Sequence, residues 1–218
     1  MSLELKGYIN GLAGINSTGR FLSFSVFNIF HALELLSAET VGRNKLAEQL
    51  GVGEGVIRTI LSRLCSAGLV QTSKTGCLLT DDGWYVWGEI EKIFPTRIEF
   101  PRTELTTSLY NYAFLVRRGD CKVGSGLEQR DAAIVAGALC AVVVLFNGGH
   151  LQINSVCDDA VEAFPHAATD MLQRLRPQEH DAIVLAGAAT ALKAMRGAFA
   201  ASWSLLDSGL ETFGTVIA

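Results

Sequence analysis

The sequence lacks paired cysteines, long hydrophobic runs and long runs of one charge sign. The longest apolar stretch, residues 132–146, contains a glycine and is shorter than the roughly 20 residues of a membrane-spanning helix, so we expect it to be buried core and predict no membrane partner. The five cysteines form no CxxC pair, which argues against a zinc site and favours reduced thiols in a cytoplasmic protein. The first residues lack the basic flank and apolar segment of a secretory signal, so export is not expected.

Length and composition favour two folded domains. The chain has 218 residues, 49% of them hydrophobic, which is enough for one large domain or two modest ones. A turn-prone stretch around Pro95 and Pro101 separates aromatic-rich segments from segments rich in Ala, Gly and Val. We therefore expect an α+β protein with a helical domain over residues 1–100 and a small α/β domain over residues 101–218.

Three amphipathic helices are predicted in the first domain. The segment that begins at Phe21 repeats apolar residues at helical spacing up to Leu36. A second helix, RNKLAEQL, is followed by Gly51, a residue typical of helix ends. The third helix opens at Gly53, and its core-facing residues, at i, i+3, i+4 and i+7, are Ile57, Ile60, Leu61 and Leu64.

A hairpin and a fourth helix follow. Two short apolar stretches, Leu69–Val70 and Cys77–Leu79, flank a polar tip over residues 72–76, which is the pattern of a hairpin. Asp81-Asp82-Gly83 then leads into WYVWGEIEKIF, where Trp84, Trp87 and Ile90 recur at helical spacing. The predicted order is helix, helix, helix, hairpin, helix.

This order resembles that of winged-helix transcriptional regulators. The likeness is carried by LAEQLGV before the third helix, ILSRLCSAGLV through its end and LTDDG after the hairpin. The longer segments GRNKLAEQLGVGEGVIRTILSRL and GLEQRDAAIVAGA are similar to a group of archaeal regulators that join a winged helix to a C-terminal domain of unknown function. The resemblance implies binding to double-stranded DNA and names no effector.

In a winged helix the third helix lies in the major groove, and the hairpin tip reaches a phosphate or the minor groove. Residues 40–80 carry five cations against Glu48 and Glu54, although the whole chain has a net charge of −4. A segregated basic face is typical of phosphate binding. The predicted DNA contacts are Arg43, Lys45, Gly55, Val56, Arg58, Thr59, Ser62, Arg63 and Lys74. The hairpin bears only Lys74, so one copy offers few phosphate contacts and a homodimer is expected.

The second domain reads as alternating strands and helices. The expected strands cover Tyr112–Val116 with a return at residues 121–123, Val142–Phe146 with a return at Leu151–Ile153, and residues 181–187. The expected helices begin near Glu128, Pro165 and Ala188. RDAAIVAGALCA and HDAIVLAGAATA are nearly repeated, but we assign the first to a helix and the second to a strand that leads into a helix. Duplication of a half-domain stays open as an explanation of the near-repeat.

A glycine-containing loop precedes the first of these helices. Free N–H groups at a helix start can hold an anion, and an arginine can bind a carboxylate or phosphate with two hydrogen bonds. The tentative site for a small anionic effector consists of Gly124, Ser125, Gly126, Glu128, Arg130 and Asp131. Two alternatives stay open, a structural ion pair of Arg130 with Glu128 or Asp131, and catalysis. No phosphate-binding loop, dinucleotide motif or Ser/His/Asp order is present, so neither a cofactor nor a catalytic residue is predicted.

Two functional hypotheses result. The preferred one is a dimeric, non-enzymatic, DNA-binding transcriptional regulator whose second domain supplies dimerisation and effector sensing. The alternative is an enzyme or ligand-binding protein whose winged helix docks another protein, with Arg58 and Arg63 forming an ordinary solvated face.

Overall fold

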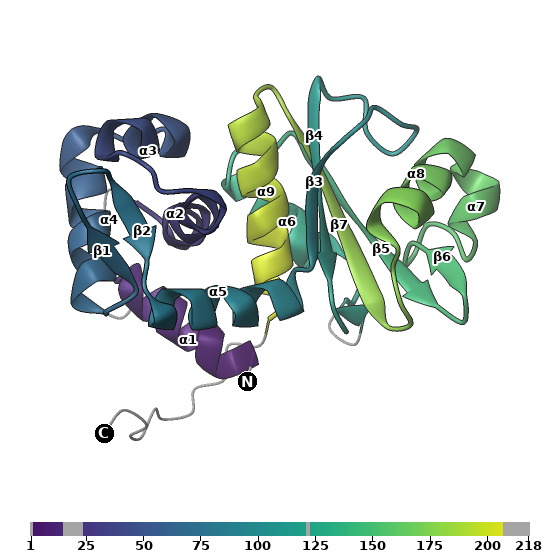
Figure 1. Cartoon of the computed structure of the whole chain (residues 1–218). Coiled ribbons are helices and arrows are strands. Elements are labelled where there is room, and N and C mark those ends of the chain that lie inside the picture. The colour runs from purple at the N-terminus through teal and green to yellow at the C-terminus, as the bar shows by residue number, and fades with distance from the viewer. Residues whose placement is uncertain (1, 15–23, 121–122, 207–218) are drawn as a thin grey trace. The chain divides into compact units, whose positions relative to one another are not determined.

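The computed structural model describes residues 2–14, 24–120 and 123–206, shown in Figure 1. They form two compact units, one running to Ile90 and the other beginning at Glu91. The first unit is helical with a small hairpin, and the second contains a five-stranded sheet with helices. The α+β class is therefore confirmed.

The first unit contains the predicted helices and hairpin. Ile57, Ile60, Leu61 and Leu64 are all buried, and Gly51 ends the second of the three helices with a left-handed φ of 64°. The spacing of apolar residues was sufficient to predict these helices, because each helix buries one stripe of apolar side chains against its neighbours. The elements are α1 (Ser2–Leu12), α2 (Val26–Ala38), α3 (Arg43–Leu50), α4 (Glu54–Ser66), β1 (Val70–Thr72), β2 (Cys77–Leu79) and α5 (Asp81–Ile93).

Two glycines allow the hairpin to pack closely. Val41 exchanges backbone hydrogen bonds with Cys77, and a Cβ atom on Gly76, which has a φ of 143°, would lie 2.9 Å from the Val41 carbonyl oxygen. A Cβ atom on Gly83 would lie 2.1 Å from the carbonyl oxygen of Leu69. The hairpin is thus held between the segment before α3 and the first turn of α5.

Two features of this unit were not predicted from the sequence. Helix α1 was not predicted, yet its Ile9 is fully buried. Trp84 has helical spacing with Trp87 and Ile90, but its side chain is 50% exposed whereas those two are buried. The stripe that α5 buries in this unit is therefore narrower than its sequence suggests.

The second unit is built on a sheet with the strand order β3-β4-β7-β5-β6, in which every neighbouring pair is antiparallel. Helices α6 and α9 pack on one face, and α7 and α8 cover the other (Figure 1). The elements are β3 (Thr96–Phe100), β4 (Tyr110–Val116), α6 (Leu127–Val135), β5 (Cys140–Asn147), β6 (His150–Gln152), α7 (Ala160–Ala163), α8 (Pro165–Leu175), β7 (Asp181–Ala188) and α9 (Ala191–Ser204).

The central strand β7 is buried along its whole length. Toward α8, Ile183 and Leu185 join a core that includes Met171 and Leu175. Toward α9, Phe114 of the neighbouring strand β4 contacts the ring of Phe199 edge-on. A strand covered on both faces reads as a continuous apolar run, which is why its position was predictable.

Most segments of the second unit were predicted correctly. The near-repeated segments adopt different structures, helix α6 and strand β7 with the start of α9, as assigned. Strand β3, which was not predicted, occupies the proposed boundary segment between Pro95 and Pro101 and pairs with β4. The return strand proposed for residues 121–123 falls on Cys121 and Lys122, which lie outside the described residues, and Val123 belongs to no strand.

Candidate nucleic-acid interface

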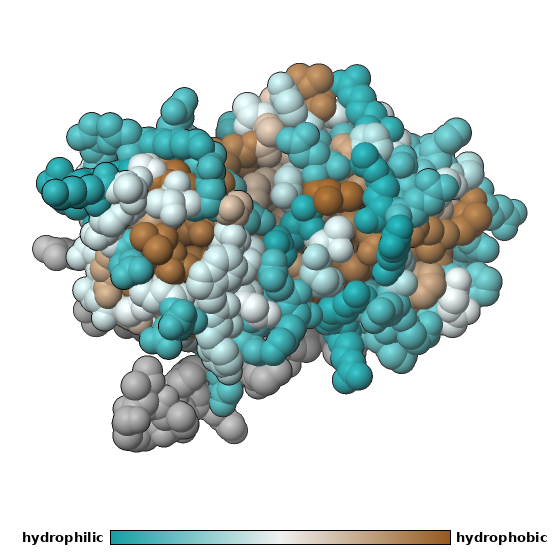
Figure 2. Space-filling model, viewed as in Figure 1, coloured by the Kyte–Doolittle hydropathy of each residue, from teal (hydrophilic) through white to brown (hydrophobic). Residues whose placement is uncertain are grey.

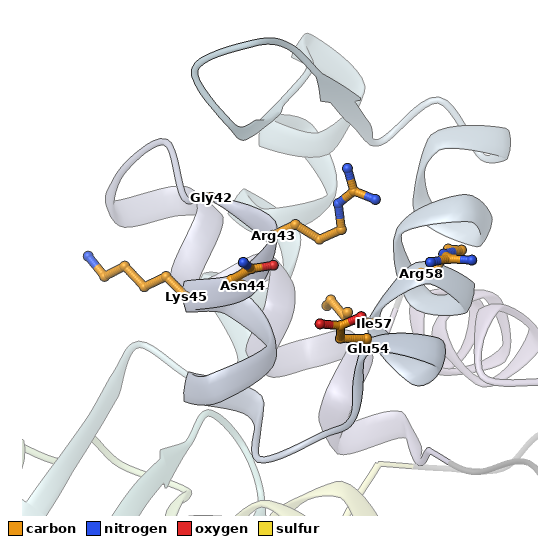
Figure 3. A pocket seen from close by; sticks show the side chains of 7 residues that line it. All are labelled: Gly42, Arg43, Asn44, Lys45, Glu54, Ile57 and Arg58. Atoms are coloured by element: carbon orange, nitrogen blue, oxygen red, sulfur yellow. The ribbon is translucent and has the colours of Figure 1, made fainter.

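A solvent-open cavity of 340 Å³ lies between the N-terminal ends of α3 and α4. The surface over α3 is hydrophilic (Figure 2). Figure 3 shows Arg43 extending from α3 toward α4, and the Glu54 carboxylate lying between the two helices. The lining residues are Gly42, Arg43, Asn44, Lys45, Glu54, Ile57 and Arg58.

Both helices that border the cavity begin without a side-chain cap. Gly42 and Gly53 are the N-cap residues of α3 and α4, and neither offers a side-chain acceptor to the first N–H groups of its helix. Uncapped N–H groups and the positive end of the helix dipole favour an anion at such positions. The backbone thus adds to the positive potential of the nearby arginines.

The cations at this cavity are available to a ligand. Arg43 and Arg58 are exposed, and neither forms an ion pair within the described part of the chain. Lys45 Nζ lies 2.7 Å from Glu39 Oε1, but both side chains are more than half exposed. An ion pair of this kind contributes little free energy and can rearrange. Three cations therefore face solvent beside one carboxylate, that of Glu54.

The outward face of α4 carries the other predicted contact residues. Gly55, Arg58, Thr59 and Ser62 are exposed, and Val56 is half-buried. The Thr59 hydroxyl donates a hydrogen bond to the Gly55 carbonyl oxygen at 3.0 Å. The helix thus presents short side chains and one long cation.

Arg63 is placed differently from the other predicted contacts. Its Nη1 donates a hydrogen bond to the carbonyl oxygen of Leu12 at 2.8 Å, and its guanidinium lies 5.2 Å from the centre of the Phe24 ring. The side chain is half-buried and connects α4 to the end of α1. This pairing was not anticipated because α1 was not predicted, and a DNA contact by Arg63 stays a prediction.

Lys74 lies at the exposed tip of the hairpin. The tip is ordered by its own hydrogen bonds, since the amide of Ser73 donates to the Gly76 carbonyl at 2.8 Å and the amide of Thr75 donates to the Ser73 hydroxyl at 3.2 Å. Lys74 is free to point outward because these bonds involve its neighbours and not its side chain.

The glycine loop of the second unit leads into α6 as predicted. Gly126 is the N-cap residue with a left-handed φ of 78°. Arg130 Nη2 lies 3.1 Å from Asp131 Oδ1, with both side chains more than half exposed. Asn154 Nδ2 donates to the carbonyl oxygen of Gly124 at 2.7 Å and so fixes the loop. Arg130 adopts the structural pairing that was one of the alternatives, while Ser125 and Glu128 are exposed.

Sequence reasoning missed four residues that line the cavity, Gly42, Asn44, Glu54 and Ile57, as members of the site. From the sequence, Glu54 was counted only as one of the two acidic residues among residues 40–80. The signal that was available is its separation of four residues from Arg58, which places both on one helix face.

Comparisons with known proteins match two separate segments of the chain, one at each end. Residues 25–94 match a family model described as the CggR N-terminal DNA binding domain, and residues 107–205 match one described as a domain of unknown function (DUF4443). The chain therefore has an N-terminal DNA-binding domain and an architecture like that of a transcriptional regulator.

Among solved structures, a hypothetical protein from Pyrococcus horikoshii OT3 is similar, with a TM-score of 0.69 and 23% sequence identity. The match covers 84% of this chain and 93% of that chain, and at this identity it shows a shared fold alone. None of the curated proteins matches the chain.

The described residues contain no cluster of three or more His, Cys, Asp or Glu side chains arranged to hold a metal ion. No helix among them combines the length and apolarity needed to cross a membrane.

Proposed function

We propose that this protein is a winged-helix transcriptional regulator that binds double-stranded DNA through α4, the start of α3 and the hairpin tip. The observation that carries the proposal is the cavity where two uncapped helix starts meet Arg43, Lys45 and Arg58 within a DNA-binding domain. An archaeal origin remains a prediction from the resemblance.

In this proposal each cation has a distinct task. Arg58, on the outward face of α4, reaches a base edge in the major groove, where arginine pairs with two acceptors of guanine. Arg43 and Lys45 meet a phosphate together with the first amides of α3, and Lys74 meets a second phosphate. Phosphate contacts orient the protein, whereas the base contact discriminates among sequences.

A salt series with two variants tests the proposal. Affinity for duplex DNA is expected to fall as salt rises, because each phosphate contact releases counterions. Arg58→Ala is expected to cost about 1–3 kcal/mol of specific affinity, whereas Lys74→Ala weakens binding to all sequences and reduces the salt slope by about one. Arg174→Ala removes an exposed cation of α8, on the other face of the sheet from α6, and is the charge-matched control for Lys74→Ala.

The alternative function makes the opposite prediction. If the first unit docks another protein, the wild type has little affinity for DNA at any salt concentration, and Arg58→Ala changes nothing in a gel-shift assay. That pair of results refutes the proposal and favours a protein-interaction module.

Dimerisation through the second unit is part of the proposal. Val135 is 90% exposed and Leu139 66% exposed, although both are large apolar residues. The amide of Leu139 donates to the Gly187 carbonyl, and Tyr110 pairs in register with Ala188, so Leu139 and Tyr110 flank the same end of β7. An exposed apolar surface can pair with its own copy, which suits a second chain related by a two-fold axis.

Light scattering tests this surface. The wild type is expected to be a dimer at micromolar concentration, and Val135→Glu is expected to be a monomer. Val161→Glu is the matched control, since Val161 is an exposed valine of α7, outside this surface. A monomeric wild type, with and without DNA, contradicts the proposal.

Effector sensing remains a proposal for the loop at residues 124–126 with Glu128, Arg130 and Asp131. The N-cap glycine and the exposed arginine support it, because an anion replacing Asp131 gains both the guanidinium and the first amides of α6. A ligand that prefers one dimer geometry changes DNA affinity by the same coupling free energy.

A further inference from the structure

We propose that Glu54 is a specificity-determining residue, which selects a base pair that presents cytosine in the major groove. This inference rests on the proposed function, because it assigns a role within the same α4 interface. It concerns the one carboxylate among the residues that line the cavity.

Glu54 occupies the first position of α4, directly after the N-cap Gly53. In the proposed binding mode the first turn of α4 is nearest the base edges. Glu54 is exposed, and it forms no ion pair with Arg43 or Arg58 in the described part of the chain. Its carboxylate lies between α3 and α4 (Figure 3) and is therefore within reach of a ligand that enters the cavity there.

An ionised carboxylate has hydrogen-bond acceptors and no donor. In the major groove cytosine offers the N4 amino group as a donor with no acceptor of its own beside it, whereas guanine presents N7 and O6 as acceptors and thymine presents O4. Adenine also offers an amino donor, N6, but its N7 acceptor lies next to that donor and repels the second carboxylate oxygen. Glu54 therefore forms a favourable hydrogen bond with cytosine, and it leaves acceptors facing one another when guanine or thymine takes that position. Pairing of acidic side chains with cytosine N4 is a known geometry of base recognition.

The neighbouring cations offset the electrostatic repulsion between the Glu54 carboxylate and the DNA phosphates. A carboxylate at a DNA surface is repelled by the phosphates, but Arg43, Lys45 and Arg58 surround the same cavity. Binding can thus stay favourable with cytosine present, while a mismatched base adds repulsion that no new contact offsets. Specificity commonly combines attraction to the right partner with repulsion of the wrong one.

Selection from a randomised duplex DNA pool tests the inference with the full-length protein. The wild type is expected to enrich sequences with one position per half-site dominated by cytosine. Glu54→Gln, whose amide both donates and accepts, is expected to lose that preference by roughly tenfold and to keep the preferences at other positions. Glu54→Ala is expected to lose it as well.

Glu48→Gln is the matched control, because Glu48 is an exposed glutamate of α3 that does not line the cavity. It makes the same change in net charge and is expected to leave every base preference unchanged. Melting temperatures of all variants are measured in parallel, since a residue that only complements the helix dipole changes stability and not base preference.

Three outcomes overturn the inference. In the first, Glu54→Gln keeps the wild-type preference at every position. In the second, it raises affinity for all sequences by one factor, as removal of simple phosphate repulsion would do. In the third, the wild type selects no sequence and shows no salt-dependent DNA binding, and that result refutes the proposed function as well.

Discussion

Arg63 and Arg58 lie on the same helix, but we expect their replacement to have opposite effects on stability and on DNA binding. Arg58 is exposed and lines the cavity, whereas Arg63 is half-buried and bonded to the end of α1. Arg63→Ala is therefore expected to destabilise the first unit and to leave the DNA contacts of the folded protein in place. Arg58→Ala is expected to weaken DNA binding and to leave the stability of the first unit unchanged.

The magnitude for Arg63 follows from its two contacts. A hydrogen bond from a charged donor contributes about 1.5–3 kcal/mol, and a cation over an aromatic ring adds about 0.5–1 kcal/mol. Because the side chain is half-buried, solvent replaces part of both contacts, and we expect a loss of about 2 kcal/mol in the free energy of unfolding. For a unit of this size that loss lowers the melting temperature by about 8–16 °C.

The assay combines calorimetry with DNA binding at low temperature, where both variants remain folded. Arg58→Ala is an exposed substitution, so its free energy of unfolding is expected to change by less than about 0.5 kcal/mol. The reasoning is refuted if Arg63→Ala melts at the wild-type temperature and loses DNA affinity to the extent that Arg58→Ala does.

Three further predictions concern the fold and the loop. Gly83→Ala places a Cβ atom against the Leu69 carbonyl oxygen, which is held by the Thr80 amide, so denaturation is expected to show a loss of about 3 kcal/mol. Hydrogen bonds from its own backbone amide, and then from the amides of His166 and Ala167 at the start of α8, lower the pKa of Glu104 to about 2. Its stabilising effect is therefore full above about pH 4.5 and is lost as the pH falls through 2. Glu104→Gln is expected to reduce the acid sensitivity of the second unit in urea titrations across that range, and an unchanged profile contradicts this role. Arg130→Ala is expected to abolish any thermal shift caused by an anionic metabolite without lowering the melting temperature of the free protein. If the variant instead melts at a lower temperature and the wild type shows no ligand response, Arg130 has only a structural role.

Local patterns determined most of the secondary structure. Ile57, Ile60, Leu61 and Leu64 specify one face of α4, and the unbroken apolar run of β7 identifies a strand covered on both sides. The charges at Arg43 and Arg58 could be assigned to the outward side by the same spacing argument. These features depend on neighbours a few residues away in the chain, so the sequence is sufficient to predict them.

The tertiary structure decided which of the charged residues are free to contact a ligand. Arg63 has the same sequence character as Arg58, but it is paired because the carbonyl of Leu12, distant in the sequence, lies beside it. Glu54 became part of the site because α3 and α4 pack with their starts around one cavity. The antiparallel order of the sheet and the exposure of Val135 likewise depend on contacts between distant segments. Hydrophobic periodicity determines which face of an element is buried, but the partner that covers it is selected by the packing of the whole chain.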